Sequence, residues 1–138
     1  DVKTFVDTNV LVYAYDRGAG FKHDLALKLL ESLWEQGSGT LSTQVLQEFY
    51  VNVRRKASKR VSPDQARSLV ADYLVWNPVV NDGVSMLEAI DLEQRFKLSF
   101  WDAMIVVAAQ KSGAKILCSE DFSHEQQFDS VQVVNPFK

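Results

Sequence analysis

The sequence predicts an α/β domain in which a mostly parallel sheet of about five short strands lies between two layers of helices. Short apolar segments typical of strands alternate with longer segments whose apolar residues recur at helical spacing. This alternation favours parallel strands with helices covering both faces of the sheet. No segment rich in glycine, serine or proline divides the chain, so residues 1–138 are expected to form a single domain.

The first predicted strand, Thr4–Val6, leads directly into Asp7, Thr8 and Asn9. β-branched and aromatic residues suit a buried strand, whereas Asp, Thr and Asn favour a turn or a helix cap. In an open α/β sheet, ligands bind just beyond the carboxyl ends of the strands. Asp7 is therefore a candidate site residue. The alternative is that one of these polar residues only caps the helix expected to begin near Val10.

Helix and strand signals alternate in the next part of the chain. Residues 10–15 predict a short buried helix, and an amphipathic helix is expected from Asp24 to Gly37. Residues 40–41 predict a short strand. Ser42 is expected to cap the helix that follows, which carries Glu48 at the flank of its apolar stripe.

Ser62 and Pro63 begin a further predicted helix, because a capping serine followed by proline is a strong start signal. Residues 76–78 break this helix, and Val79–Val80 are expected to form a brief strand. Residues 82–83 then open another helix. The residues of that helix expected to face the core are Val84, Leu87, Ile90 and Phe96.

The segment 103–109 is apolar nearly all round, which predicts a buried helix with Asp102 near its start. Lys115–Cys118 predicts a strand, and residues 119–121 follow it just as polar residues follow the first strand. Val131–Val134 is the last predicted strand.

Four acidic residues stand out by position: Asp7 and Asp121 follow strands, Asp102 starts a buried helix, and Glu48 lies beside an apolar stripe. Each has a simple structural explanation when taken alone, as a helix-dipole charge, a turn residue or a solvated edge. Together they predict a site, because parallel strands bring their carboxyl ends to one edge of the sheet. Clustered carboxylates need cations, and Mg²⁺ and Mn²⁺ prefer oxygen ligands.

Zinc is disfavoured, because His23, His124 and the single cysteine, Cys118, do not have the spacing of a zinc site. Both histidines are expected at the surface, and Cys118 is expected to be a small buried residue. No apolar run is long enough to cross a bilayer, so no membrane partner is expected and a cytoplasmic location is predicted.

The formal net charge of −3 argues against nucleic-acid binding by bulk electrostatics alone. Bound cations would nevertheless restore positive charge where a phosphate sits. A basic run that includes Lys59 and Arg60 offers Arg54, Arg55 and Lys56 as candidate contacts to RNA phosphates. The alternative, weighed equally, is that these cations complement the dipole of the preceding helix.

In their order and spacing, four motifs resemble those of the PIN-domain nucleases, and especially the VapC-like toxins. The motifs are Asp7-Thr8-Asn9, Ser42 with Val45, Leu46 and Glu48, Leu98 to Ala103, and Leu117 to Phe122. The resemblance implies a PIN-like fold and an Mg²⁺- or Mn²⁺-dependent endoribonuclease that hydrolyses RNA. It also implies a cognate antitoxin protein as a partner, and a homodimer.

The resemblance assigns the catalytic and metal-binding roles to Asp7, Glu48, Asp102 and Asp121, and supporting polar roles to Asn9 and Ser119. Asp121 is chosen over Glu120 because Ser119 aligns with the threonine of the family's usual Thr-x-Asp ending. Metal ions would activate a water and stabilise charge on the phosphate.

Three alternatives stay open: a PIN-fold RNA-binding or scaffold protein without turnover, a PIN nuclease of RNA processing without an antitoxin, and a different acidic-site enzyme. The last is disfavoured. A phosphatase with Asp7 as nucleophile would want a second Asp where Asn9 stands.

Overall fold

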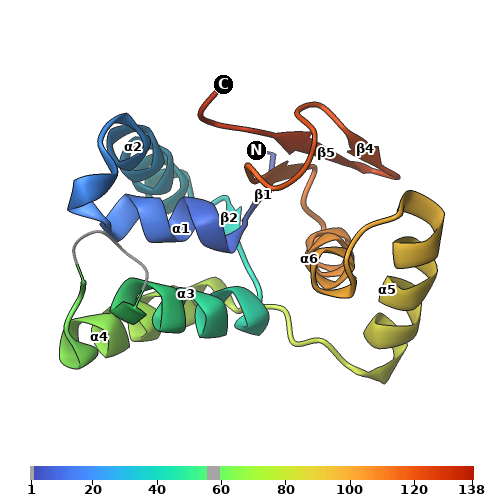
Figure 1. The fold of residues 1–138 in the computed structure, drawn as a ribbon, viewed down its shortest axis with the longest axis horizontal. Helices are drawn as coiled ribbons and strands as arrows, with labels where there is room; N and C mark the ends of the chain where they lie inside the picture. Colours follow the sequence, from blue (N-terminus) through green and yellow to red (C-terminus); the bar gives the residue numbers. More distant parts are fainter. Residues whose placement is uncertain (1, 56–59) are drawn as a thin grey trace.

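A computed structural model describes residues 2–55 and 60–138, and these form a five-stranded sheet with helices on both sides (Figure 1). The strands are β1 (Thr4–Val6), β2 (Gly39–Thr40), β3 (Ile116–Cys118), β4 (Gln127–Phe128) and β5 (Val131–Val134). Their order is β2-β1-β3-β5-β4, and every neighbouring pair is parallel except β4 with β5. The predicted α/β fold with a mostly parallel sheet is confirmed.

The strand order fixes where a site can form. From the central β1 the chain moves to β2 on one side and later to β3 on the other. Crossovers between parallel strands are right-handed, so connections that run in opposite directions lie on opposite faces. Helices α1 (Thr8–Tyr15) and α2 (Phe21–Gln36) therefore cover one face, and α6 (Phe100–Lys111) covers the other (Figure 1). The strand order reverses between β1 and β3, the position where open α/β sheets bind ligands.

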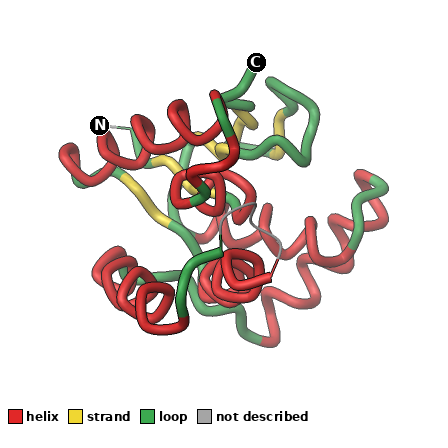
Figure 2. The backbone as a smooth tube through the Cα atoms, turned by 60° about the vertical axis from the view of Figure 1, so that its left-hand side comes forward, coloured by secondary structure: helices red, strands yellow, loops and turns green. Residues whose placement is uncertain are grey.

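The remaining helices extend this framework. Helix α3 (Thr43–Arg55) packs against α1 and α4 (Pro63–Tyr73), and α5 (Gly83–Phe96) packs against α6. Short 3₁₀ turns cover Arg17–Ala19 and Leu74–Trp76. Figure 2 shows the short strands lying among these helices. None of the described helices is both long and apolar enough to span a membrane.

The predicted helix starts depend on side-chain caps that the structure contains. The hydroxyl of Ser42 accepts a hydrogen bond from the Val45 amide at 3.2 Å. Ser62 and Gln65 form a reciprocal capping box at the start of α4. Ser99 caps α6, whose segment from Ala103 to Ala109 is buried as predicted. Local capping chemistry therefore sets these boundaries.

The prediction for the buried face of α5 was wrong. Val84, Leu87 and Ile90 are exposed, whereas Ser85, Ala89 and Leu92 are the buried residues of this helix. The small side chains of Ser85 and Ala89 let α5 approach α6 closely, and the Ser85 hydroxyl bonds the Lys111 ammonium of α6. Of the four residues predicted to face inward, only Phe96 packs against the core.

Other differences from the sequence predictions are local. Helix α1 begins at Thr8 rather than near Val10, because Asp7 is its N-cap. Helix α2 begins at Phe21, three residues before the predicted start. Instead of a Val79–Val80 strand, a single parallel bridge joins Val79 to Ser42. The two-residue strand β4 was not predicted, because two residues are too short to show alternation.

Candidate active site

All four predicted carboxylates line one cavity of about 510 Å³, which we call the acidic pocket. They come from four separate segments: Asp7 after β1, Glu48 in α3, Asp102 in α6 and Asp121 after β3. A larger cavity of about 780 Å³, lined by Arg17 and Arg60 among others, contains none of them. Although the acidic pocket is the smaller of the two cavities, it is the better candidate site, because its lining supplies several groups able to bind a cation.

Pairing between β1 and β3 fixes the position of Asp7. Its backbone amide donates to the carbonyl of Cys118 at 3.0 Å, which places Asp7 beside Ser119. One carboxylate oxygen, Oδ1, accepts from the Thr8 amide at 2.7 Å, and the other, Oδ2, accepts from the Ser119 hydroxyl at 2.7 Å. Asp7 is therefore both a helix cap and a pocket residue, so the two interpretations of the sequence are compatible.

The pKa of the Asp7 carboxyl is raised from 3.8 to about 7, chiefly because burial removes the charged form from water. Hydrogen bonds from Ser119 and Thr8 lower the pKa, and the negative charges of Asp121 and Glu48 raise it further. Burial outweighs the hydrogen bonds because the residue is only 3 % exposed. A cation in the pocket would favour the ionised form of Asp7.

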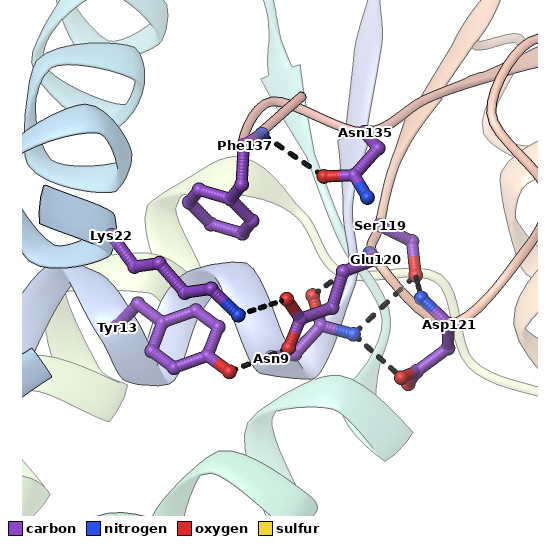
Figure 3. Close-up of polar contacts among 8 residues, drawn as sticks. All are labelled: Asn9, Tyr13, Lys22, Ser119, Glu120, Asp121, Asn135 and Phe137. Carbon is purple, nitrogen blue, oxygen red and sulfur yellow. Dashed lines mark hydrogen bonds and ion pairs between the residues drawn. The ribbon is translucent and has the colours of Figure 1, made fainter.

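Asn9 fixes the loop that follows β3 (Figure 3). Its side-chain amide donates to Asp121 Oδ2 at 2.9 Å, and its Oδ1 accepts from the Glu120 amide at 3.3 Å. The Ser119 hydroxyl accepts from the Asp121 amide at 3.0 Å. Asn9 and Ser119 thus hold Asp121 beside Asp7. They are the two residues to which the family resemblance gives supporting roles.

Glu120 has a different environment from Asp121. Its carboxylate accepts a hydrogen bond from the Tyr13 hydroxyl at 2.5 Å and pairs with the Lys22 ammonium at 2.8 Å. The Tyr13 ring packs edge-on against Phe137, with ring centroids 5.2 Å apart. Figure 3 shows the Glu120 side chain directed toward Tyr13 and Lys22, away from Asp121. Asp121 lines the acidic pocket, whereas Glu120 does not.

The other two acids are also oriented by neighbouring polar groups. Glu48 Oε1 accepts from the Thr8 hydroxyl at 2.8 Å. Asp102 lies in the first turn of α6, where its amide donates to the Ser99 hydroxyl at 3.1 Å. Burial raises the pKa of the Asp102 carboxyl, and the nearby charge of Asp121 raises it further.

The donor set suits a hard cation that keeps part of its water shell. Among the described residues, no group of three or more His, Cys, Asp or Glu side chains could hold a metal ion by itself. Mg²⁺ takes only one or two carboxylates directly and keeps several waters, so it does not require such a group. Cys118 is buried in β3 with its thiol pKa raised to about 12 by burial, and it does not line the pocket.

The two predicted phosphate contacts that the structure describes, Arg54 and Arg55, lie outside the acidic pocket. Arg54 donates to the Tyr50 hydroxyl at 3.2 Å at the end of α3, and neither Arg54 nor Arg55 lines the pocket. Lys56 and Lys59 lie outside the described residues. The alternative that Arg54 and Arg55 complement the dipole of the α3 C-terminus fits their placement in its last turn.

Sequence reasoning overlooked several residues that line the acidic pocket, among them Gln44 and Trp101. Gln44 lies four residues before Glu48, so the two share one face of α3, and this spacing could have drawn attention to it. Trp101 was considered only as a neighbour of Asp102. Its side chain is 63 % exposed at the pocket, which no sequence pattern indicated.

The PIN domain family model matches residues 4–127, a span that contains all four carboxylates. Two solved structures of known proteins are similar. A toxin–antitoxin complex from Klebsiella pneumoniae has a TM-score of 0.70 and 18 % identity, with 97 % of this chain and 98 % of that chain covered. Mycobacterium tuberculosis VapC20, a sarcin–ricin loop cleaving toxin, has a TM-score of 0.65 and 22 % identity, with 88 % and 93 % covered.

These structural likenesses are below 25 % identity and show the shared fold. No curated protein matches the chain. The family model, however, spans nearly the whole sequence, from the first residue of β1 to the first residue of β4. The chain therefore belongs to the PIN domain family.

Proposed function

We propose that this protein is a divalent-metal-dependent endoribonuclease that hydrolyses RNA phosphodiester bonds and acts as the toxin of a toxin–antitoxin pair. The observation that carries the proposal is that four carboxylates from separate segments line one pocket at the switch point of the sheet. Ionised carboxylates held close repel one another unless a positively charged group lies between them. Burial is the main cause of the raised pKa of Asp7, and the negative charges of Asp121 and Glu48 raise it further.

The attacking group in this proposal is water, because the two hydroxyls that bond the carboxylates, those of Thr8 and Ser119, are engaged in those hydrogen bonds. The Ser119 hydroxyl is fully buried and donates to Asp7. The Thr8 hydroxyl is bound to Glu48. Both hydroxyls thus orient carboxylates.

Asp7 and Asp121 are the proposed direct or water-mediated ligands of Mg²⁺ or Mn²⁺, while Glu48 and Asp102 orient the attacking water. The chemistry that a bound cation supplies is positive charge for the phosphate and a lowered pKa for water. The chain contributes orientation: Thr8 and Ser119 hold Asp7, and Asn9 holds Asp121.

The names of the two similar structures support the proposed partners. One is a toxin–antitoxin complex, and the other is described as cleaving the sarcin–ricin loop. The exposed apolar side chains of α5, Val84, Leu87 and Ile90, offer a surface for a protein partner. An antitoxin and a second copy of this chain are both proposed partners. Sedimentation velocity of the protein alone tests the homodimer.

The deciding experiment is cleavage of structured and single-stranded RNA by purified protein with Mg²⁺, with Mn²⁺ and with chelator. Asp7→Ala is the inactive variant, and Asp91→Ala, at an exposed position on α5, is the matched control. We expect metal-dependent cleavage by the wild type and the control only. Equal cleavage by Asp7→Ala would refute the mechanism.

A second candidate function is RNA binding without turnover. It is favoured by the exposed Trp101 at the acidic pocket, which offers a stacking surface for a base whether or not cleavage follows. RNA binding by a folded protein that cuts no RNA with either cation would support it.

A further inference from the structure

Gln44 lines the acidic pocket and carries a buried hydrogen-bond acceptor that has no partner among the described residues. The residue lies in the first turn of α3, lines the pocket and is only 8 % exposed. Its Nε2 donates to the backbone carbonyl of Trp101 at 3.3 Å, which sets the orientation of the amide. Its Oε1 is buried and has no hydrogen-bond partner among the described residues.

A buried acceptor without a donor lowers the stability of the fold, because it has lost its hydrogen bonds to water without gaining another. Such atoms are few in folded proteins and call for an explanation. Among the described residues, the buried side-chain atoms without a partner are the acceptor oxygens of Gln44 and Asn81 and the Nε–H donor of Arg54, and only Gln44 lines the acidic pocket. A donor carried by the occupant of the pocket would remove this cost.

The chemistry of the pocket restricts what that donor is. Its charged lining consists of the four carboxylates, which accept hydrogen bonds when ionised. A phosphodiester linkage carries acceptor oxygens and no donor. The ribose next to each RNA phosphate carries a 2′-hydroxyl, which is a donor that DNA lacks. The amino groups of the bases are donors too, but the 2′-hydroxyl lies on the ribose beside the phosphate that the acidic pocket would hold. A water held by a cation is the other source of an O–H donor.

We propose that Gln44 Oε1 accepts a hydrogen bond from an O–H group brought by the occupant of the acidic pocket, and that this group is the ribose 2′-hydroxyl of the bound RNA. This inference rests on the proposed function and makes Gln44 a residue that distinguishes RNA from DNA. The last torsion of a glutamine side chain is broad, and the 3.3 Å bond from Nε2 to Trp101 is long, so the proposal requires the amide to rotate on binding until Oε1 reaches the pocket.

The position of Trp101 supports a nucleotide at this place. Its indole is 63 % exposed and lines the same pocket, and it packs edge-on against Phe100 with ring centroids 5.2 Å apart. Exposed aromatic rings are stacking platforms for unpaired bases. Gln44 holds the backbone carbonyl of Trp101, so α3 and α6 present the acceptor and the indole together.

The test compares the wild type with Gln44→Met, which keeps the length of the side chain and removes its hydrogen bonds. Gln94→Met, at an exposed position of α5, is the matched control. Single-stranded RNA carrying one 2′-deoxy substitution at each position in turn is the substrate series. Binding is measured by fluorescence anisotropy in Ca²⁺, which takes the same oxygen ligands, and cleavage is measured in Mg²⁺.

We expect one 2′-deoxy position to weaken binding to the wild type about 5- to 10-fold, the effect of one hydrogen bond. Gln44→Met should lose a similar factor on RNA and become insensitive to that substitution, while Gln94→Met should behave as the wild type. An equal loss on RNA and on every deoxy variant, seen only in cleavage with Mg²⁺, would support the hydrogen bond but assign it to a water.

Two results would overturn the inference. One is that Gln44→Met binds and cuts RNA like the wild type. The other is that it loses the same factor for RNA and DNA under all conditions, as a purely structural defect would. The deoxy series on the wild type needs no variant, so misfolding of Gln44→Met leaves the question answerable.

Failure of the proposed function gives a different pattern. Asp7-dependent cleavage with a flat deoxy series would refute the contact between Gln44 and the ribose 2′-hydroxyl and keep the nuclease. Binding that depends on Gln44 and on one 2′-hydroxyl, without any cleavage, would keep this inference and refute the nuclease.

Discussion

Replacing Asp7 with asparagine tests the electrostatics of the acidic pocket through the pH dependence of stability. Without divalent cations, the buried carboxyl keeps its proton up to about pH 7 in the folded chain, whereas the unfolded chain loses it near 3.8. The folded state binds more protons between these two values, so the free energy of unfolding should fall as pH rises through this interval. At about 1.4 kcal/mol per pKa unit, the interval corresponds to roughly 4 kcal/mol.

Asparagine can keep the local hydrogen bonds. Its Oδ1 can accept from the Thr8 amide as Asp7 Oδ1 does, and its Nδ2 can donate to the Ser119 hydroxyl, which then rotates its own proton away. The variant loses the ionisable group and little else. We expect Asp7→Asn to be more stable than the wild type above pH 7 by about 2–4 kcal/mol. The two should converge at low pH, where the wild-type carboxyl is protonated.

The assay is urea unfolding followed by circular dichroism at several pH values between 4 and 8.5, in chelator, with Asp91→Asn as the exposed control. Other groups titrate in both proteins, so the informative quantity is the difference between wild type and variant. A difference that stays constant over the whole pH range would refute the claim that Asp7 is a desolvated carboxyl coupled to its acidic neighbours.

Three further substitutions test individual parts of the site. Glu120→Gln should lower the free energy of unfolding by about 1 kcal/mol, because it removes a partly exposed ion pair, and it should leave RNA cleavage nearly intact. Loss of cleavage would show that Glu120, and not Asp121, is the acid that cleavage requires. Asp121→Asn should raise the melting temperature in chelator, because it removes one negative charge from the pocket, and it should reduce the further rise that Mg²⁺ causes. Differential scanning fluorimetry measures both effects, and no change in either would show that the acids are not coupled. Neutralising Arg54 and Arg55 together should lower the salt slope of RNA binding by up to about 2 if both contact phosphates. An unchanged slope would assign these arginines to the helix dipole.

Much of the fold could be predicted because its signals are local. The caps at Ser62 and Ser99 act on neighbouring amides, and the buried segment of α6 is apolar on every face. The face of α5 could not be predicted in this way. Its larger apolar residues are exposed, since contact with α6 selects small side chains such as Ser85 and Ala89, and periodicity does not distinguish close packing from exposure.

In the site, too, the sequence predicted features that depend on local signals and missed those that depend on residues distant in the chain. The order of polar residues after two parallel strands predicted that Asp7 and Asp121 would be near each other, and the structure brings both to the acidic pocket. The choice between Glu120 and Asp121 depends on Tyr13 and Lys22, which are distant in sequence. The unpaired oxygen of Gln44 likewise depends on tertiary packing. The spacing of residues along the sequence does not predict such contacts.

Capping and site formation at Asp7 are connected physically. Each of its two carboxylate oxygens accepts one hydrogen bond, from Thr8 or from Ser119, and a carboxylate oxygen has room for about two. The cap therefore orients the group without using all of its capacity to bind a ligand. The hydrogen bonds from Ser119 and Thr8 hold the carboxyl in place and lower its pKa, but burial raises the pKa more. The two hydrogen bonds therefore compensate the negative charge of the ionised form only in part. A rigid carboxylate whose charge is incompletely compensated is suited to bind a cation, which is why the same residue can serve as both helix cap and site.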